Sequence, residues 1–207
     1  MEEEKFLKAI KEIRKTDKKR NFEKTIDLIV NLKNFNAKKD SFTTFVEAPN
    51  KVKNKRVAGF FEKKSELVDT ITKEEFPKFK EKKELKKLVK DYDFFIANAK
   101  LMPAVATDFG RVLGPAGKMP SPQLGIIPIE NPEAIKSVLG KINSSVRVRV
   151  KDPSIKIGIG KQSLTDDQIL KNIIVVYNKI VDNLPKKAEN VKNILIKLSM
   201  DKPIRVI

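Results

Sequence analysis

The chain has 207 residues, and 40% of them are hydrophobic, which is enough to bury the core of one large domain or of two small ones. It contains neither Cys nor His, so disulfides, Cys/His zinc sites, Cys nucleophiles and an imidazole general base are excluded. Its 44 Lys and Arg against 27 Asp and Glu give a formal charge of +17, which favours a polyphosphate partner because neutralised phosphates release condensed counterions.

The first fifty residues predict a helix followed by two strands. Residues 2–16 place apolar side chains at helical spacing, with glutamates at the start and basic residues at the end, as the helix dipole favours. Residues 25–31 alternate as in a strand with one buried face, and Thr25 and Asp27 share its polar face. Residues 42–48 predict a second strand, which the following Pro-Asn pair ends.

The middle of the chain has the pattern of a small α/β layer with a parallel sheet. Short apolar runs at 57–61 and 94–97 are typical of strands buried on both faces. Residues 65–70 and 78–90 lie between these runs and predict helices, which gives the alternation of a parallel sheet.

The last third returns to strands with one apolar face. A helix is expected to begin at Asn131 and to stop at Gly140. A second helix begins at a capping box, in which Thr165 is followed three residues later by Gln168. Three alternating segments predict the strands: 146–150, 155–159 and 193–199.

These patterns predict a fold class of α/β and α+β material in two domains. Residues 1–50 and 152–207 form one discontinuous α+β domain, and residues 51–151 form an inserted α/β domain. The inserted block carries 22 basic and 12 acidic side chains, a net charge of +10, against +3 and +4 for the two terminal blocks. Most of the excess positive charge is therefore expected in the inserted domain.

The Gly- and Pro-rich segment 110–123, GRVLGPAGKMPSPQ, predicts an irregular exposed loop. A phosphate loop needs Gly five residues before its Gly-Lys pair and Ser or Thr after it, but Val112 and Met119 stand at those positions. Two interpretations stay open: a surface where Arg111 and Lys118 contact anions, or a rigid connection.

Part of this segment, LGPAGKMPSP, resembles the signature of the universal ribosomal protein L-one family in its archaeal form. Four further segments match that family in order, so the resemblance covers nearly the whole chain: KRNFEKTIDLIVNLK, DFFIANAKLMP, IGIGKQSLTDDQI and NILIKLSMDKPIRV. The resemblance implies an RNA-binding domain built from both termini, an inserted Rossmann-like domain and a hinge of two strands.

The resemblance also implies a function and its partners. It implies a structural protein of the large ribosomal subunit, without cofactor, metal or catalytic residues, that binds ribosomal RNA and forms the mobile stalk near the exit site. It further implies help in the release of deacylated tRNA and repression of translation through the protein's own messenger RNA. The N-terminus lacks the apolar core of a signal peptide, so we expect a cytoplasmic protein, monomeric when free.

The RNA-contacting positions of the family fall on seven residues: Phe22, Thr25, Asp27, Asn193, Ser199, Met200 and Asp201. Short hydroxyl, amide and carboxylate side chains can bond to ribose 2′-hydroxyls, which distinguish RNA from DNA. Phe22 has two interpretations, a contact with a ribose or base and a place in the core. Asp201 stands where the family usually has Gly, whose positive φ allows close approach of RNA, so its contact is expected to be weaker or reshaped.

Two alternatives belong to other classes of protein. One is an α/β enzyme that binds a phosphorylated substrate through the Gly-rich segment, although no spaced set of catalytic groups supports it. The other is a nonspecific nucleic-acid compactor, for which binding would depend steeply on salt without sequence preference.

Overall fold

The computed structural model describes the chain except for residues 1, 16–20, 37–38, 80 and 207. It divides into two compact units: unit 1, made of Met1–Lys53 and Ser144–Ile207, and unit 2, made of Asn54–Asn143. The C-terminal residue of the predicted helix over 2–16 lies outside the described residues. Each unit is described by itself.

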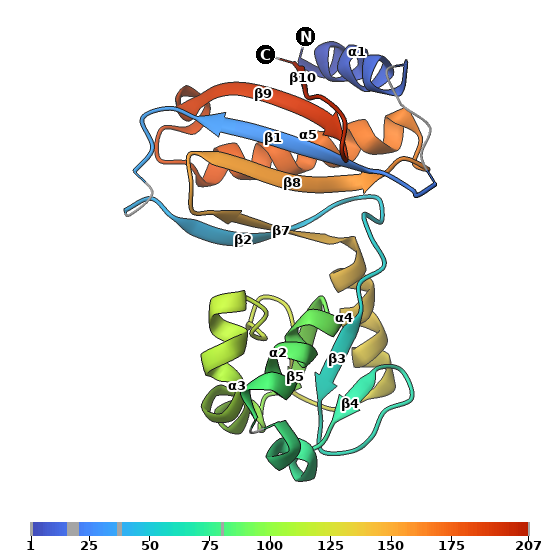
Figure 1. Cartoon of the computed structure of the whole chain (residues 1–207), viewed down its shortest axis with the longest axis vertical. Helices are drawn as coiled ribbons and strands as arrows, with labels where there is room; N and C mark the ends of the chain where they lie inside the picture. Colours follow the sequence, from blue (N-terminus) through green and yellow to red (C-terminus); the bar gives the residue numbers. More distant parts are fainter. Residues whose placement is uncertain (1, 16–20, 37–38, 80, 207) are drawn as a thin grey trace. The chain divides into compact units, whose positions relative to one another are not determined.

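Unit 1 holds both ends of the chain and is an antiparallel α+β domain (Figure 1). Its elements are α1 (Glu2–Lys15), β1 (Thr25–Leu32), β2 (Phe42–Glu47), β7 (Ser145–Val150), β8 (Ser154–Lys161), α5 (Asp166–Asn183), η2 (Lys187–Asn190), β9 (Val191–Leu198) and β10 (Ile204–Arg205). Four strands form a sheet in the order β10-β9-β1-β8, while β2 and β7 form a second sheet of two strands.

The core of unit 1 lies between the sheets and the two helices. The predicted alternation of β1 is confirmed, because Ile26, Leu28 and Val30 are all at most 2% exposed and pack with side chains of α1 and α5. The predicted capping box is confirmed as well. The Thr165 side chain accepts from the backbone N–H of Gln168, and the Gln168 side chain accepts in return from the backbone N–H of Thr165.

Unit 2 is a Rossmann-like α/β layer with a parallel sheet in the order β4-β3-β5-β6. Its elements are β3 (Val57–Phe60), β4 (Asp69–Ile71), η1 (Lys73–Phe79), α2 (Lys82–Asp91), β5 (Phe94–Asn98), α3 (Met102–Ala116), β6 (Ile126–Ile127) and most of α4 (Pro132–Ser144). All residues of β3 and β5 are buried, as their continuous apolar runs predicted.

The irregular loop predicted over residues 110–123 is wrong for its first half, which is the end of helix α3. Val105, Phe109 and Leu113 recur every four residues and are at most 1% exposed, so one buried stripe stabilises a helix that contains Gly and Pro. Gly117, at φ 68°, ends the helix in the left-handed conformation.

Two other predicted elements of unit 2 differ from the structure. The helix predicted over 65–70 is wrong, because this segment is a turn that leads into β4. The predicted stop at Gly140 is also wrong, because α4 continues to Ser144. Ile135 and Ile142 are both buried on α4, so packing on either side of the glycine keeps the helix intact.

The division of the chain also differs from the predicted limits of 51–151, because β7 belongs to unit 1. Val148 and Val150 are fully buried in the core of unit 1, and β7 pairs with β2 along its whole length. Unit 1 consequently carries 27 Lys and Arg against 15 Asp and Glu, a net charge of +12, and unit 2 carries 17 against 12, a net charge of +5. The excess positive charge therefore lies mainly in unit 1, not in the inserted domain.

A helix crosses a bilayer only if it is both long and apolar enough. None of the helices, over the described parts of the chain, combines the two properties needed to cross a membrane.

Lys118 is predicted to be a structural residue. Its ammonium donates to the backbone carbonyls of Val89 and Tyr92, at 2.6 and 2.7 Å, and so ties the end of α3 to the last turn of α2 and the residue after it. Lys118→Met keeps the aliphatic stem and removes both bonds, so we expect the free energy of unfolding to fall by about 2 kcal/mol. Thermal denaturation measures this loss, with Arg111→Met, at an exposed position of α3, as the matched control. Equal stability of the two variants would contradict the structural role.

Candidate nucleic-acid interface

The polar side chains of β1 and β9 form one face of the four-stranded sheet, opposite the face that α1 and α5 cover (Figure 1). The register places Asp27 opposite Lys197 and Asn31 opposite Asn193. We call this surface the polar face. Because β1 and β9 come from opposite ends of the chain, their pairing is what gathers most of the predicted RNA-contacting residues.

Thr25 and Ser199 meet where β1 begins and β9 ends. The carbonyl oxygen of Thr25 accepts from the backbone N–H of Ser199 at 2.9 Å and from the Ser199 hydroxyl at 3.2 Å. The Ser199 hydroxyl is thereby engaged by the backbone. The described residues offer the Thr25 hydroxyl no such partner, so this hydroxyl can bond to a ligand.

Met200 follows in the tight turn after β9. Its φ is 69°, and its side chain is 73% exposed. A non-glycine residue with positive φ is uncommon and costs backbone strain, so its conformation is held by the surrounding turn. A large apolar side chain at this exposure is available for contact with a partner.

Asp201 has a different environment from the one expected. Positive φ occurs at Met200 and not at Asp201, so the backbone of Asp201 does not adopt the conformation that a glycine would favour. The Asp201 carboxylate instead accepts from the ammonium of Lys24 at 2.6 Å, and the Lys24 side chain is 1% exposed. This buried ion pair, which the sequence pattern did not indicate, connects the turn after β9 to the residue before β1.

Phe22 lies in the short segment that leads into β1 and is 49% exposed, which excludes its interpretation as a core residue. Glu23 beside it accepts from the hydroxyl of Ser163 and from the ammonium of Lys161. These bonds lower the pKa of the Glu23 carboxyl, with the bond from Lys161 as the largest cause. The backbone carbonyl of Lys24 also accepts from the N–H of Gln162. The segment that presents Phe22 is therefore fixed to the turn after β8.

Asp27 is a partly buried carboxylate on the polar face. Burial raises its pKa, and the charge of Lys197 lowers it to a smaller degree. The described residues provide no hydrogen bond to this carboxylate. Gly158 lies beside it, and a Cβ there would stand 3.2 Å from the Thr25 methyl and 3.6 Å from an Asp27 oxygen. Because Gly158 has no Cβ, no side chain at this position projects over the surface between Thr25 and Asp27.

Asn193 lies farther along the same face. Its side-chain oxygen accepts from the Asn31 amide at 2.6 Å, and the Asn31 oxygen accepts from the Ser154 hydroxyl at 2.7 Å. Asn193 pairs with a residue six positions beyond Thr25 on β1, a distance of about 20 Å at the rise of a strand. The fold therefore brings Phe22, Thr25, Ser199, Met200 and Asp201 to one corner, while Asn193 lies toward the other end of the face.

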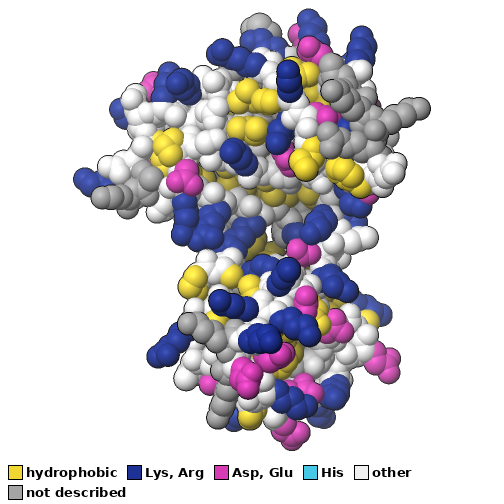
Figure 2. Space-filling model, viewed as in Figure 1, with side chains coloured by type: hydrophobic (Ala, Val, Ile, Leu, Met, Phe, Trp, Pro, Cys, Tyr) yellow, Lys and Arg dark blue, Asp and Glu magenta, His cyan; other side chains and the backbone are white. Residues whose placement is uncertain are grey.

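Several residues of this interface were missed by the sequence pattern. Lys24, Lys161 and Ser163 hold the corner, and Gly158 shapes it. Three of these four residues lie in the segment GIGKQS, which belongs to one of the segments that resemble the family. Figure 2 shows hydrophobic and uncharged surface over the middle of the sheet, with Lys and Arg side chains gathered over β2 and β7.

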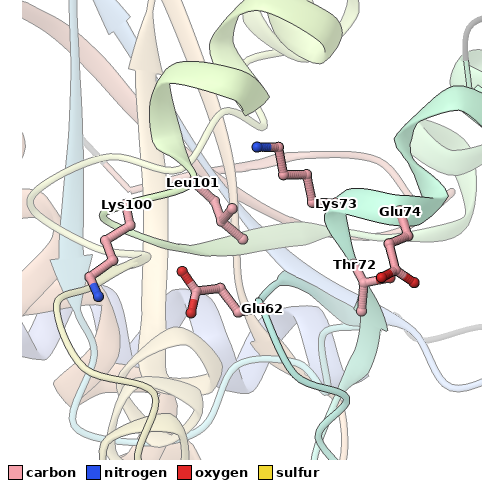
Figure 3. Close-up of a pocket in the computed structure, with 6 residues that line it drawn as sticks. All are labelled: Glu62, Thr72, Lys73, Glu74, Lys100 and Leu101. Atoms are coloured by element: carbon pink, nitrogen blue, oxygen red, sulfur yellow. The ribbon is translucent and has the colours of Figure 1, made fainter.

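A pocket of unit 2 lies at the carboxyl ends of the parallel strands, where α/β proteins bind ligands. Glu62 follows β3, and Lys100 and Leu101 follow β5. Figure 3 shows the Lys73 and Lys100 side chains on either side of Glu62; Lys73 is the first residue of η1, and Lys100 lies in the turn after β5. Among the described residues, no hydrogen bond or ion pair joins Glu62 to Lys73 or Lys100. The anion contact proposed for Lys118 is also unavailable, since its ammonium is bonded to two carbonyls.

Comparison with known proteins identifies the family. The model of the Ribosomal protein L1p/L10e family matches residues 10–201. The chain is 33% identical over 217 residues to the large ribosomal subunit protein uL1 of Methanothermobacter thermautotrophicus, covering 99% of this chain and 100% of that protein. It is also 33% identical to uL1 of Methanocaldococcus jannaschii, covering 100% of this chain and 96% of that protein. The chain therefore belongs to the Ribosomal protein L1p/L10e family.

Proposed function

We propose that this chain binds large-subunit ribosomal RNA through the polar face of unit 1. The matched relatives are named as proteins of the large ribosomal subunit, so the chain is a structural ribosomal protein and not an enzyme. The observation that carries the RNA-binding proposal is the corner where β1 begins and β9 ends. Phe22 and Met200 are exposed in the segments that flank these strand ends, and Thr25 is the first residue of β1. Apolar surface next to hydroxyl and carboxylate groups suits ribose and base contacts.

Net charge and individually placed side chains contribute differently to RNA binding. The net charge of +12 on unit 1 attracts any polyanion and carries no sequence information. Selection of one RNA then depends on groups at fixed positions, chiefly Thr25, Asp27 and Met200. Ser199 and Asp201 act mainly by holding the corner, because their polar atoms are already engaged.

We further propose roles for the protein within the ribosome and in the control of translation. As a large-subunit component, the protein would form the mobile stalk near the exit site and assist the release of deacylated tRNA. It would also repress translation by binding its own messenger RNA at a site that imitates the ribosomal one. Translation of that messenger in vitro should fall as protein is added, an unrelated messenger should be unaffected, and the ribosomal RNA fragment should relieve repression by competition.

The decisive experiment for RNA binding is protection footprinting of large-subunit RNA by the full chain. The protected fragment and an unrelated duplex are then compared for affinity at several salt concentrations. Specific binding predicts a preference for the fragment that persists as salt rises. Equal affinity for both RNAs would overturn the proposal and favour a nonspecific compactor.

Thr25→Ala is expected to weaken binding of the protected fragment by about 1 kcal/mol, because a hydroxyl that pairs with RNA is lost. Binding of the unrelated duplex should not change, and neither should thermal stability. Thr25→Ser retains the hydroxyl and serves as the control. A loss of affinity as large in Thr25→Ser as in Thr25→Ala would assign the effect to packing of the methyl group instead.

Asp27→Asn is expected to raise stability while lowering specificity. Burial raises the Asp27 pKa in the folded state, so its ionised form destabilises the fold above that pKa. We therefore expect Tm to rise at neutral pH. The difference from wild type should close as pH falls through the folded pKa toward the unfolded value of about 3.9. The preference for the protected fragment over the duplex should fall, since an amide loses one acceptor and also repels phosphate less.

Lys24→Met tests the role of the buried ion pair. It leaves the Asp201 carboxylate, whose side chain is 14% exposed, without its ammonium partner, so we expect stability to fall by about 3 kcal/mol. Adding Asp201→Asn should restore part of this loss, because the buried carboxylate is neutralised. Lys161→Met at the exposed pair with Glu23 is the control and should lower stability much less, because water screens an exposed ion pair. Unchanged stability in Lys24→Met would refute the structural role of the pair.

A further inference from the structure

The two-stranded sheet of β2 and β7 carries a basic surface that is separate from the seven RNA-contacting positions. Arg147 and Arg149 alternate on β7 with valines that lie in the core of unit 1, so both arginines point outward. The register places Arg147 opposite Phe45 and Arg149 opposite Thr43. We call these four residues the arginine face.

Arg147 is positioned by an aromatic ring, but its guanidinium lacks a hydrogen-bond acceptor at Nε among the described residues. Its guanidinium carbon lies 5.9 Å from the centroid of the Phe45 ring, within the range of a cation–π contact. Its Nε is buried and has no hydrogen-bond acceptor among the described residues. Burial lowers the Arg147 pKa, and the charge of Arg149 lowers it further. A guanidinium that is partly desolvated and repelled by its neighbour is stabilised by an anion supplied from outside.

The described carboxylates do not supply that anion. Among the described residues, neither Arg147 nor Arg149 forms an ion pair. Glu47 lies on the same side of β2, but the register places it opposite Ser145, one pair beyond Arg147. Alternate residues of a strand are about 6.5 Å apart, so the two guanidinium groups can reach one phosphate together or one phosphate each.

The arginine face lies on the same side of unit 1 as the polar face. Val148 of β7 and Ile157 of β8 bury in one core, and α5 contacts both β8 and β2. The outward side chains of β7 therefore share a side with those of β8, which pairs with β1. Lys156 of β8 is exposed on the strand between the two surfaces. An RNA that lies on the polar face can thus continue over β8 to β7.

We propose that Arg147 and Arg149 form a second RNA contact, which binds the phosphate backbone of the RNA held at the polar face. Phe45 positions Arg147 for this contact. The inference rests on the proposed RNA binding and adds a distinct role, because backbone phosphates are the same in every sequence. The arginine face accordingly supplies affinity and register, while the corner at Thr25 supplies selection.

The experiment uses the full chain with Arg147→Gln and Arg149→Gln, and with Lys171→Gln on the exposed side of α5 as a control of equal charge. The probes are the RNA fragment protected in footprinting and an unrelated duplex of equal length. Each arginine variant should bind both RNAs about 5-fold more weakly and lower the salt dependence by about one phosphate contact. The control should change both quantities much less. Arginine variants that behave like the control would overturn the proposal.

Two further variants separate the possible explanations. Arg147→Lys keeps the charge without the planar fork and should bind with an intermediate affinity. Arg149 is exposed and is not part of the Phe45 contact, so Arg149→Gln tests the proposal even where Arg147→Gln does not fold. Thr25→Ala separates the contact at the polar face from the contact at the arginine face. If Thr25→Ala weakens specific binding and the arginine variants do not, only the second contact fails; if none of them matters, the RNA-binding proposal fails with it.

An acidic protein segment is the other partner that such a face could bind. Polyglutamate of matched charge serves as its probe in the same assay. Competition by polyglutamate that depends on Arg147 and Arg149, without any effect of the same variants on RNA affinity, would overturn the assignment to RNA. Competition that is weak and equal for the variants and the wild type supports it.

Discussion

The candidate interface depends on the antiparallel pairing of β1 with β9. The register places Ile26 opposite Leu198 at one end and Asn31 opposite Asn193 near the other. Side chains of a strand alternate with a period of two, so a slip of one residue would turn Thr25 and Asp27 into the core. The apolar faces of both strands disfavour that slip, since it would turn Leu28, which is fully buried, toward the polar face. Core packing therefore determines which polar groups face outward.

The same pairing explains how a domain can interrupt another without disturbing its site. β1 and β9 are joined by a segment that includes all of unit 2, but the entropic cost of closing a loop grows only slowly with its length. Local bonds then fix the corner more closely than the strands can. The ion pair of Lys24 with Asp201 and the bonds between Ser199 and Thr25 connect the two ends of the chain where the side chains must be placed accurately.

The sequence predicted the strands of unit 1 well, because an alternating pattern with one buried face is unambiguous. It did not predict α3, since Gly110, Gly114 and Pro115 all disfavour a helix. Burial of three large side chains along one stripe outweighs those local preferences, and this packing is visible only in three dimensions. Tertiary partners also escaped prediction. In the sequence, nothing distinguishes Lys24 from a surface lysine. The fold buries it against the carboxylate of Asp201, 177 positions away.

Asp27 and Arg147 carry opposite charges on one side of unit 1, and together they limit the kinds of partner that this side can bind. Asp27 is a partly buried carboxylate that lacks a donor among the described residues, and Arg147 has a buried Nε that lacks an acceptor there. An acidic peptide offers acceptors to the arginine but repels the carboxylate, and a basic peptide does the reverse. RNA offers both kinds of group along one chain, because its phosphates accept and its ribose hydroxyls and base amino groups donate. A surface that requires both a donor for Asp27 and an acceptor for Arg147 is therefore better matched to RNA than its net positive charge alone indicates.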